Sequence, residues 1–161
     1  MLRSFQEGVK PAAPWTVALS MLFNCEMVRP CFLIVDREFP GTISTRKLVM
    51  ETAKYNVITA YSGTEAVHTF EQFPGITGIV LNADMRDTPC GEVARQLKAI
   101  RSDIPIVSIL SPGAEQCPGA DYHLESFDPK QLLALLQKLT PLETAEILAR
   151  EQKLERDTPG V

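Results

Sequence analysis

The sequence of 161 residues lacks any apolar run of the roughly 18 residues that a membrane-spanning helix requires. It also lacks a basic excess, because 16 Lys and Arg stand against 20 Asp and Glu, which gives a net charge of −4. We therefore expect neither a membrane nor a nucleic acid as a partner. The apolar segment 14–23 is similar to the core of a signal peptide, but no A-x-A cleavage site follows it and Glu26 adds a charge. These absences favour a cytoplasmic protein.

Motifs for metal binding and enzymatic catalysis are missing as well. The four cysteines form no C-x-x-C pair, and His68 and His123 lie near none of them in the sequence. We therefore expect no zinc site, and reduced, mostly buried thiols. The sequence has neither a G-x-S-x-G motif nor a glycine-rich phosphate loop, so nothing in it indicates an enzyme. The cysteines are Cys25, Cys31, Cys90 and Cys117.

From Cys31 onward, strand-like and helix-like segments alternate. Short apolar or β-branched runs are typical of strands buried in a sheet. They lie at 31–35, 56–61, 76–82, 104–110 and 121–124. Because such strands alternate with helical segments, the pattern predicts an α/β fold with a parallel sheet covered on both faces.

Capping and turn residues predict where the helices begin. The first helix starts near Thr42, and the second follows the capping box Ser62-x-x-Glu65. The third starts at Thr88-Pro89 with one apolar face, and the fourth follows the cap Asp128-Pro129. The apolar face of the third helix consists of Val93, Leu97 and Ile100.

No helix is expected between the fourth and fifth strands. Residues 111–120 read SPGAEQCPGA, with two prolines and with glycines at 113 and 119. Proline removes a helical hydrogen bond and glycine weakens a helix, so this segment cannot hold a normal helix.

The chain divides into three predicted parts. Residues 1–29 form an N-terminal extension without clear periodicity, and residues 30–139 form the α/β domain. Residues 140–161 form a C-terminal helix and tail, with a capping box Thr140-x-x-Glu143 and helix to about Arg156. Ile147 and Leu154 lie one heptad apart and form a weak apolar seam. The seam leaves open whether this helix lies solvated against the domain or serves as a dimer contact or interdomain linker.

Four segments carry a resemblance to a known family: FLIVDREFP, YNVITAYSGTEAV, IPIVSIL and GADYHLESFDP. Over about residues 30–139 the chain resembles the receiver domain of bacterial two-component response regulators. The resemblance implies a flavodoxin-like, CheY-like sheet of five parallel strands in the order 2-1-3-4-5. It also implies a signalling role, in which a phosphoryl group is accepted beyond the carboxyl ends of the strands.

The five chemical positions of such a receiver are mostly altered. Asp36 matches the first of two adjacent acids that bind magnesium, and Arg37 replaces the second. Ala83 occupies the position of the phosphoryl-accepting aspartate, Leu110 that of the hydroxyl residue, and Glu125 that of the lysine. A methyl group cannot be phosphorylated, and the carboxylate of Glu125 would repel a phosphoryl group. The resemblance therefore indicates a degenerate pseudo-receiver without magnesium, although Tyr122 matches the aromatic residue that changes rotamer in the family.

Two hypotheses concern the charged residues of this pocket. In the first, Arg37 pairs with Asp36, Asp84 or Glu125 as a built-in substitute for the metal. In the second, Asp84 takes over as the phosphoryl acceptor with Asp36 and magnesium, which requires the strand end to redirect its side chain. Asp84 otherwise serves as a structural partner of Arg37 or as a plain loop carboxylate.

The expected mode of action is binding to a protein. The partner is another signalling protein, or a second copy of the chain, contacted through residues 111–139 and the C-terminal helix. Three functions remain: a phosphorylation-independent signalling module, a phosphoacceptor that uses Asp84 and magnesium in a phosphorelay, and a dimerisation module.

Overall fold

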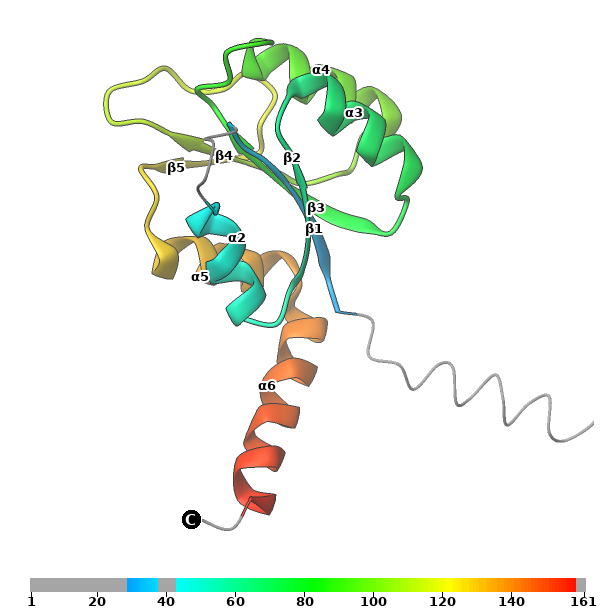
Figure 1. The fold of residues 1–161 in the computed structure, drawn as a ribbon, viewed down its shortest axis with the longest axis vertical. Coiled ribbons are helices and arrows are strands. Elements are labelled where there is room, and N and C mark those ends of the chain that lie inside the picture. Colours follow the sequence, from blue (N-terminus) through cyan, green and yellow to red (C-terminus); the bar gives the residue numbers. More distant parts are fainter. Residues whose placement is uncertain (1–28, 38–42, 159–161) are drawn as a thin grey trace, which may run out of the picture.

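The computed structural model describes residues 29–37 and 43–158. Residues 1–28 of the predicted N-terminal extension and the predicted helix start at Thr42 lie outside these ranges. The chain forms a central sheet with two helices on each face and a further helix at the C-terminal end (Figure 1). The elements are β1 Cys31–Val35, α2 Thr45–Thr52, β2 Asn56–Ala60, α3 Gly63–Gln72, β3 Ile76–Asn82, α4 Cys90–Ile100, β4 Ile106–Leu110, β5 Tyr122–Glu125, α5 Pro129–Leu139 and α6 Pro141–Asp157.

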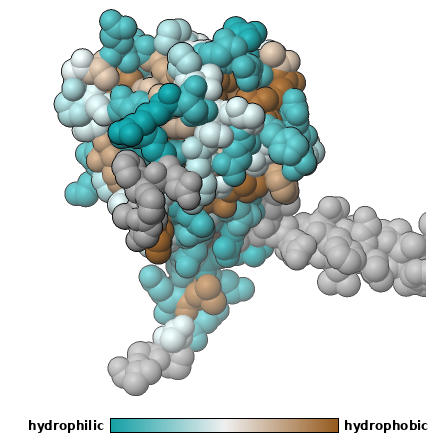
Figure 2. All heavy atoms as spheres, turned by 45° about the horizontal axis from the view of Figure 1, so that its top comes forward, coloured by the Kyte–Doolittle hydropathy of each residue, from teal (hydrophilic) through white to brown (hydrophobic). Residues whose placement is uncertain are grey.

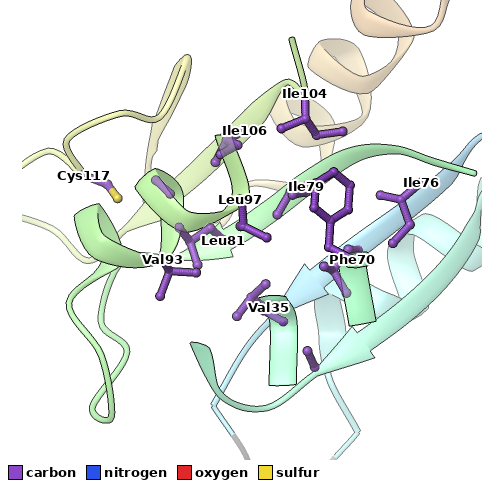
Figure 3. Packing of buried hydrophobic residues seen from close by; sticks show 14 residues of the cluster. Val35, Phe70, Ile76, Ile79, Leu81, Val93, Leu97, Ile104, Ile106 and Cys117 are labelled. Atoms are coloured by element: carbon purple, nitrogen blue, oxygen red, sulfur yellow. The ribbon is translucent and has the colours of Figure 1, made fainter. Parts of the chain in front are cut away.

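All five strands are parallel and lie in the order β2-β1-β3-β4-β5, which confirms the predicted topology. The central strands are buried on both faces, which explains their continuous apolar runs. One core cluster joins the sheet to α3 and α4 through side chains such as Phe70, Val93 and Leu97 (Figure 3). The other joins it to α2 and α5 through Met50 and Leu132.

Three helix starts follow side-chain caps. The Ser62 hydroxyl accepts a hydrogen bond from the Glu65 N–H at 3.0 Å, as the predicted capping box requires. Asp128 caps α5 by accepting from the Lys130 N–H at 2.9 Å. Helix α2 begins at Thr45, because Ser44 provides the cap.

Helix α4 begins slightly later than predicted. Pro89 is the cap residue, so the helix begins at Cys90. Val93 and Leu97 are fully buried, but Ile100 is 40% exposed. Ile100 is the last residue of the helix, so no further turn encloses it.

The connection between β4 and β5 contains no helix, as predicted. Gly113 and Gly119 adopt positive φ angles of 79° and 85°, which are strained for other residue types. β4 begins two residues later than expected, and β5 runs from Tyr122 to Glu125 rather than over 121–124. Asp121 instead accepts a hydrogen bond from the Ile106 N–H at 2.9 Å with its side chain.

Helix α6 starts without the predicted capping box, because Thr140 makes no side-chain cap. The Thr140 hydroxyl donates to the Leu136 carbonyl at 2.8 Å, and the Thr144 hydroxyl bonds to that of Tyr55 at 3.1 Å. These bonds hold the first turns of α6 against the domain, where Ile147 is 5% exposed. The rest of the helix points away from the sheet, and Leu154 is 67% exposed (Figure 1).

Within residues 29–37 and 43–158, no helix combines the length and apolarity needed to cross a bilayer.

Candidate functional site

Asp36 lies just beyond β1, at the carboxyl edge of the sheet. Its N–H donates to the Ala60 carbonyl at 3.0 Å, which extends the pairing with β2 and fixes the backbone. One carboxylate oxygen, Oδ1, accepts from the Arg37 N–H at 2.9 Å, Arg46 Nη1 at 2.7 Å and Asn82 Nδ2 at 3.0 Å. The other, Oδ2, accepts from the Ser44 hydroxyl at 3.1 Å. Four donors therefore surround the carboxylate of Asp36, a residue that is 8% exposed as a whole.

These donors set the charge state of Asp36. Burial by itself raises the pKa of the carboxyl group. The hydrogen bond from Asn82, the positive charge of Arg46, and the bonds from Arg37 and Ser44 outweigh burial, so the pKa falls below its usual value. Asp36 is therefore an anion at neutral pH, and a protein cation balances its charge.

Arg46 is the residue that sequence reasoning missed. It extends from the first turn of α2, forms the ion pair with Asp36, and has its guanidinium 5.8 Å from the centre of the Phe127 ring. It thus bridges the end of β1 to the segment that follows β5. One signal could have found it: a cation in the first turn of a helix is disfavoured by the helix dipole and calls for an acidic partner.

Arg37 contacts Asp36 through its backbone. Its backbone N–H binds Asp36, whereas the guanidinium on that carboxylate comes from Arg46. The Arg37 side chain lines a shallow cavity together with Arg46, Asp84 and Phe127. A pairing of the Arg37 guanidinium with Asp36, Asp84 or Glu125 stays a prediction.

Asp84 lies in a turn rather than in an extended strand. Ala83 continues the pairing with β4 through its N–H, which donates to the Ile109 carbonyl at 3.0 Å. The chain then turns, and the Asp84 N–H donates to Asn82 Oδ1 at 2.9 Å. The turn brings the Asp84 carboxylate to the end of β4, where it accepts a hydrogen bond from the Ser111 hydroxyl.

The remaining family positions lie around this edge. Leu110 pairs in register with Glu125, and Leu110 is buried while Glu125 is exposed. The cavity is lined by Leu110 and Ser126 but not by Glu125. Tyr122 begins β5 and is half-buried. The structure thus gathers Asp36, Arg37, Asp84 and Leu110 in one place and leaves Glu125 at its margin.

The residues present do not fit the magnesium ion that receivers use. Mg²⁺ requires several oxygen ligands in octahedral geometry. Both oxygens of Asp36 already accept hydrogen bonds, and the Arg46 guanidinium, a cation, lies 2.7 Å from Oδ1. In the part of the chain that the structure describes, no group of three His, Cys, Asp or Glu could hold a metal ion. We therefore derive no chemistry through magnesium.

Comparison with known proteins finds solved structures of similar fold. No protein-family model matches the sequence, and no curated protein sequence matches it. A response regulator receiver domain protein from Clostridium thermocellum matches with a TM-score of 0.58 and 18% identity, over 78% of this chain and 98% of that one. A response regulator receiver protein from Sinorhizobium medicae matches with a TM-score of 0.60 and 22% identity, over 71% and 97%.

A chain of the CheX–CheY–BeF3–Mg complex from Borrelia burgdorferi matches with a TM-score of 0.61 and 22% identity, over 69% of this chain and 89% of that one. The fold of this protein is therefore that of response regulator receiver domains. This confirms the CheY-like fold that the sequence resemblance implied.

Proposed function

We propose that this chain is a receiver-like signalling module that acts by binding another protein and is not regulated by phosphorylation. The observation that carries the proposal is the Arg46–Asp36 ion pair of 2.7 Å. A receiver binds its metal ion with acidic residues. Here the Arg46 guanidinium already pairs with Asp36, the one acidic residue that matches those positions. Ala83 provides no nucleophile at the acceptor position. On this proposal the protein is not an enzyme, uses no cofactor, and works in the bacterial cytoplasm.

The test is exposure to a small phosphodonor. We expect the intact mass to stay unchanged after incubation with acetyl phosphate and magnesium. Attack on the phosphoryl group requires a free carboxylate beside a bound metal ion, and this proposal assigns no such carboxylate. An Asp84→Asn variant should behave identically. A phosphorylated wild type together with an unmodified Asp84→Asn variant would overturn the proposal.

One observation favours a second candidate, a phosphoacceptor that uses Asp84. The hydrogen-bonded pair Asp84 and Ser111 lies one residue past the family positions of the acceptor and the hydroxyl residue, which are Ala83 and Leu110. The pair thus places a carboxylate and a hydroxyl together at the same sheet edge. The phosphodonor experiment separates the two candidates, because only this one predicts modification at Asp84.

The proposed contact surface comprises residues 111–139 and α6. The exposed large hydrophobic side chains of the described residues do not fall within 111–139, whereas Leu142, Leu148 and Leu154 lie on α6. Figure 2 shows the projecting helix as mostly hydrophilic with a small hydrophobic patch. The support for α6 as a contact element is therefore that the helix is exposed and extends away from the domain.

Self-association through α6 is the dimerisation alternative. If it operates, Leu154→Glu should convert a dimer to a monomer in sedimentation experiments without unfolding the domain, since Leu154 is 67% exposed. Exposed Lys153→Glu is the matched control on the same helix. A wild-type chain that stays monomeric at high concentration would exclude this alternative.

A further inference from the structure

The loop between β4 and β5 packs closely against the first turns of α4 (Figure 3). A Cβ atom at Gly91 would lie 3.2–3.4 Å from three ring carbons of Pro118. One turn further along α4, the Cβ of Ala94 would lie 3.5 Å from a Cβ at Gly119. Two successive contacts therefore align the loop with the start of the helix, and Gly91 allows the close approach.

Two cysteines precede the residues of the first contact. Cys90 is the first residue of α4 and comes before Gly91, and Cys117 comes before Pro118. Cys117 is 1% exposed within the core cluster, and half-buried Cys90 packs against the same cluster. Both are free thiols. Burial, followed by a hydrogen bond to the Cys90 thiol, raises the pKa of the Cys117 thiol.

The backbone separation suits a covalent link. Disulfide-bonded cysteines have Cβ atoms about 3.5–4.5 Å apart. A Cβ at Gly91 would lie 3.4 Å from the Cβ of Pro118, so the helix and the loop already approach to this range one residue further along. Cys90 and Cys117 precede Gly91 and Pro118 on the same two segments and pack in the same core cluster, so little backbone movement is needed to join them.

We propose that Cys90 and Cys117 form a reversible disulfide that fastens the β4–β5 loop to α4. This inference goes beyond the proposed function and does not depend on it. The oxidant on this proposal is a small disulfide, because both protein thiols are free to react with one. Oxidation locks a segment that replaces a helix of the usual receiver fold.

The reaction balances as two thiol–disulfide exchanges. The more exposed thiol, Cys90, loses its proton and attacks one sulfur of the small disulfide, which releases one small thiolate. Cys117 then loses its proton and attacks the Cys90 sulfur of the mixed disulfide, which releases the second small thiolate. The two protein thiols are oxidised to one disulfide, and the small disulfide is reduced to two thiols that take up the two protons.

The test uses the full chain in glutathione buffers of increasing oxidised fraction. After free thiols are blocked by alkylation, trypsin places Cys90 in the peptide 87–95 and Cys117 in the peptide 102–130. We expect these two peptides to be joined in the oxidised sample and separate after reduction. The oxidised protein should also melt about 5 °C or more above the reduced protein, because the link constrains the unfolded chain.

Variants separate this pair from other thiol chemistry. Cys31→Ser is the matched control and should leave the joined peptides and the melting shift intact. Cys90→Ser should abolish both, and it avoids disturbing the buried Cys117. A Cys90 that stops at a stable mixed disulfide with glutathione, or joins Cys25 or Cys31 instead, would overturn the proposal. So would two thiols that stay alkylatable at every glutathione ratio.

Discussion

At the residue scale, the pocket is defined by the ion pair between Asp36 and Arg46. Asp36 remains at the end of β1, and its charge is balanced by Arg46 from α2. The side chains of Arg46 and Asp36 are 18% and 12% exposed, so solvent screens this pair less than a surface pair. A mostly buried carboxylate without its partner is costly, which makes Arg46 the residue on which the local structure depends most.

We predict that Arg46→Ala lowers the free energy of unfolding by about 2–3 kcal/mol, because it leaves the Asp36 carboxylate buried without a cation. The control is Lys47→Ala on the same helix, whose ion pair with Glu51 is exposed and 3.9 Å long. That variant should change stability by less than about 0.5 kcal/mol. Urea unfolding measures both, and equal losses would contradict the role given to Arg46.

The pKa of Asp36 gives a pH prediction. Because its pKa is lower in the folded than in the unfolded state, its stabilising contribution is complete above the ordinary carboxyl pKa of about 3.9. The contribution is lost as the pH falls through the lower folded value. Asp36→Asn removes this titration, so the stability difference between wild type and variant should shrink between about pH 5 and pH 3. A difference that is constant with pH would exclude the proposed charge state.

At the element scale, α6 depends on the domain only through its first turns. Tyr55→Phe removes the hydroxyl that bonds to Thr144, so we predict a loss of about 0.5–1.5 kcal/mol and faster amide exchange at the start of α6. Tyr61→Phe is the control, because Tyr61 is 45% exposed. If Tyr55→Phe leaves amide exchange in α6 unchanged, the hydroxyl pair does not anchor the helix.

Elements were predictable where local chemistry decides the structure. Apolar runs located β1 and β3, and side-chain caps located the starts of α3 and α5, because these signals act over a few residues. The capping box of α6 failed, because the Thr140 hydroxyl bonds back to α5 instead. The pairing of Arg46 with Asp36 was also not predicted, because it requires the start of α2 to lie against the end of β1. The two residues are ten positions apart in the chain.

At the scale of the whole molecule, the chain has the receiver fold, and on our proposal it does not use the phosphate chemistry of that fold. The sheet is specified by buried strands that make no use of the carboxyl edge, so the edge can change while the core stays. This separation explains why the fold followed from the sequence while the pairing at the site did not.

The most direct test is a pair of amide NMR spectra, recorded without and with magnesium and beryllofluoride, a mimic of an aspartyl phosphate. The Borrelia burgdorferi CheY, solved in a complex with BeF3 and Mg, serves as the positive control. We predict no shifts at Asp36, Asp84 or Tyr122. Arg46 already pairs with the Asp36 carboxylate, and Ala83 has no carboxylate to bind beryllofluoride. Saturable shifts at these residues would contradict the proposal and assign the acceptor role to Asp84.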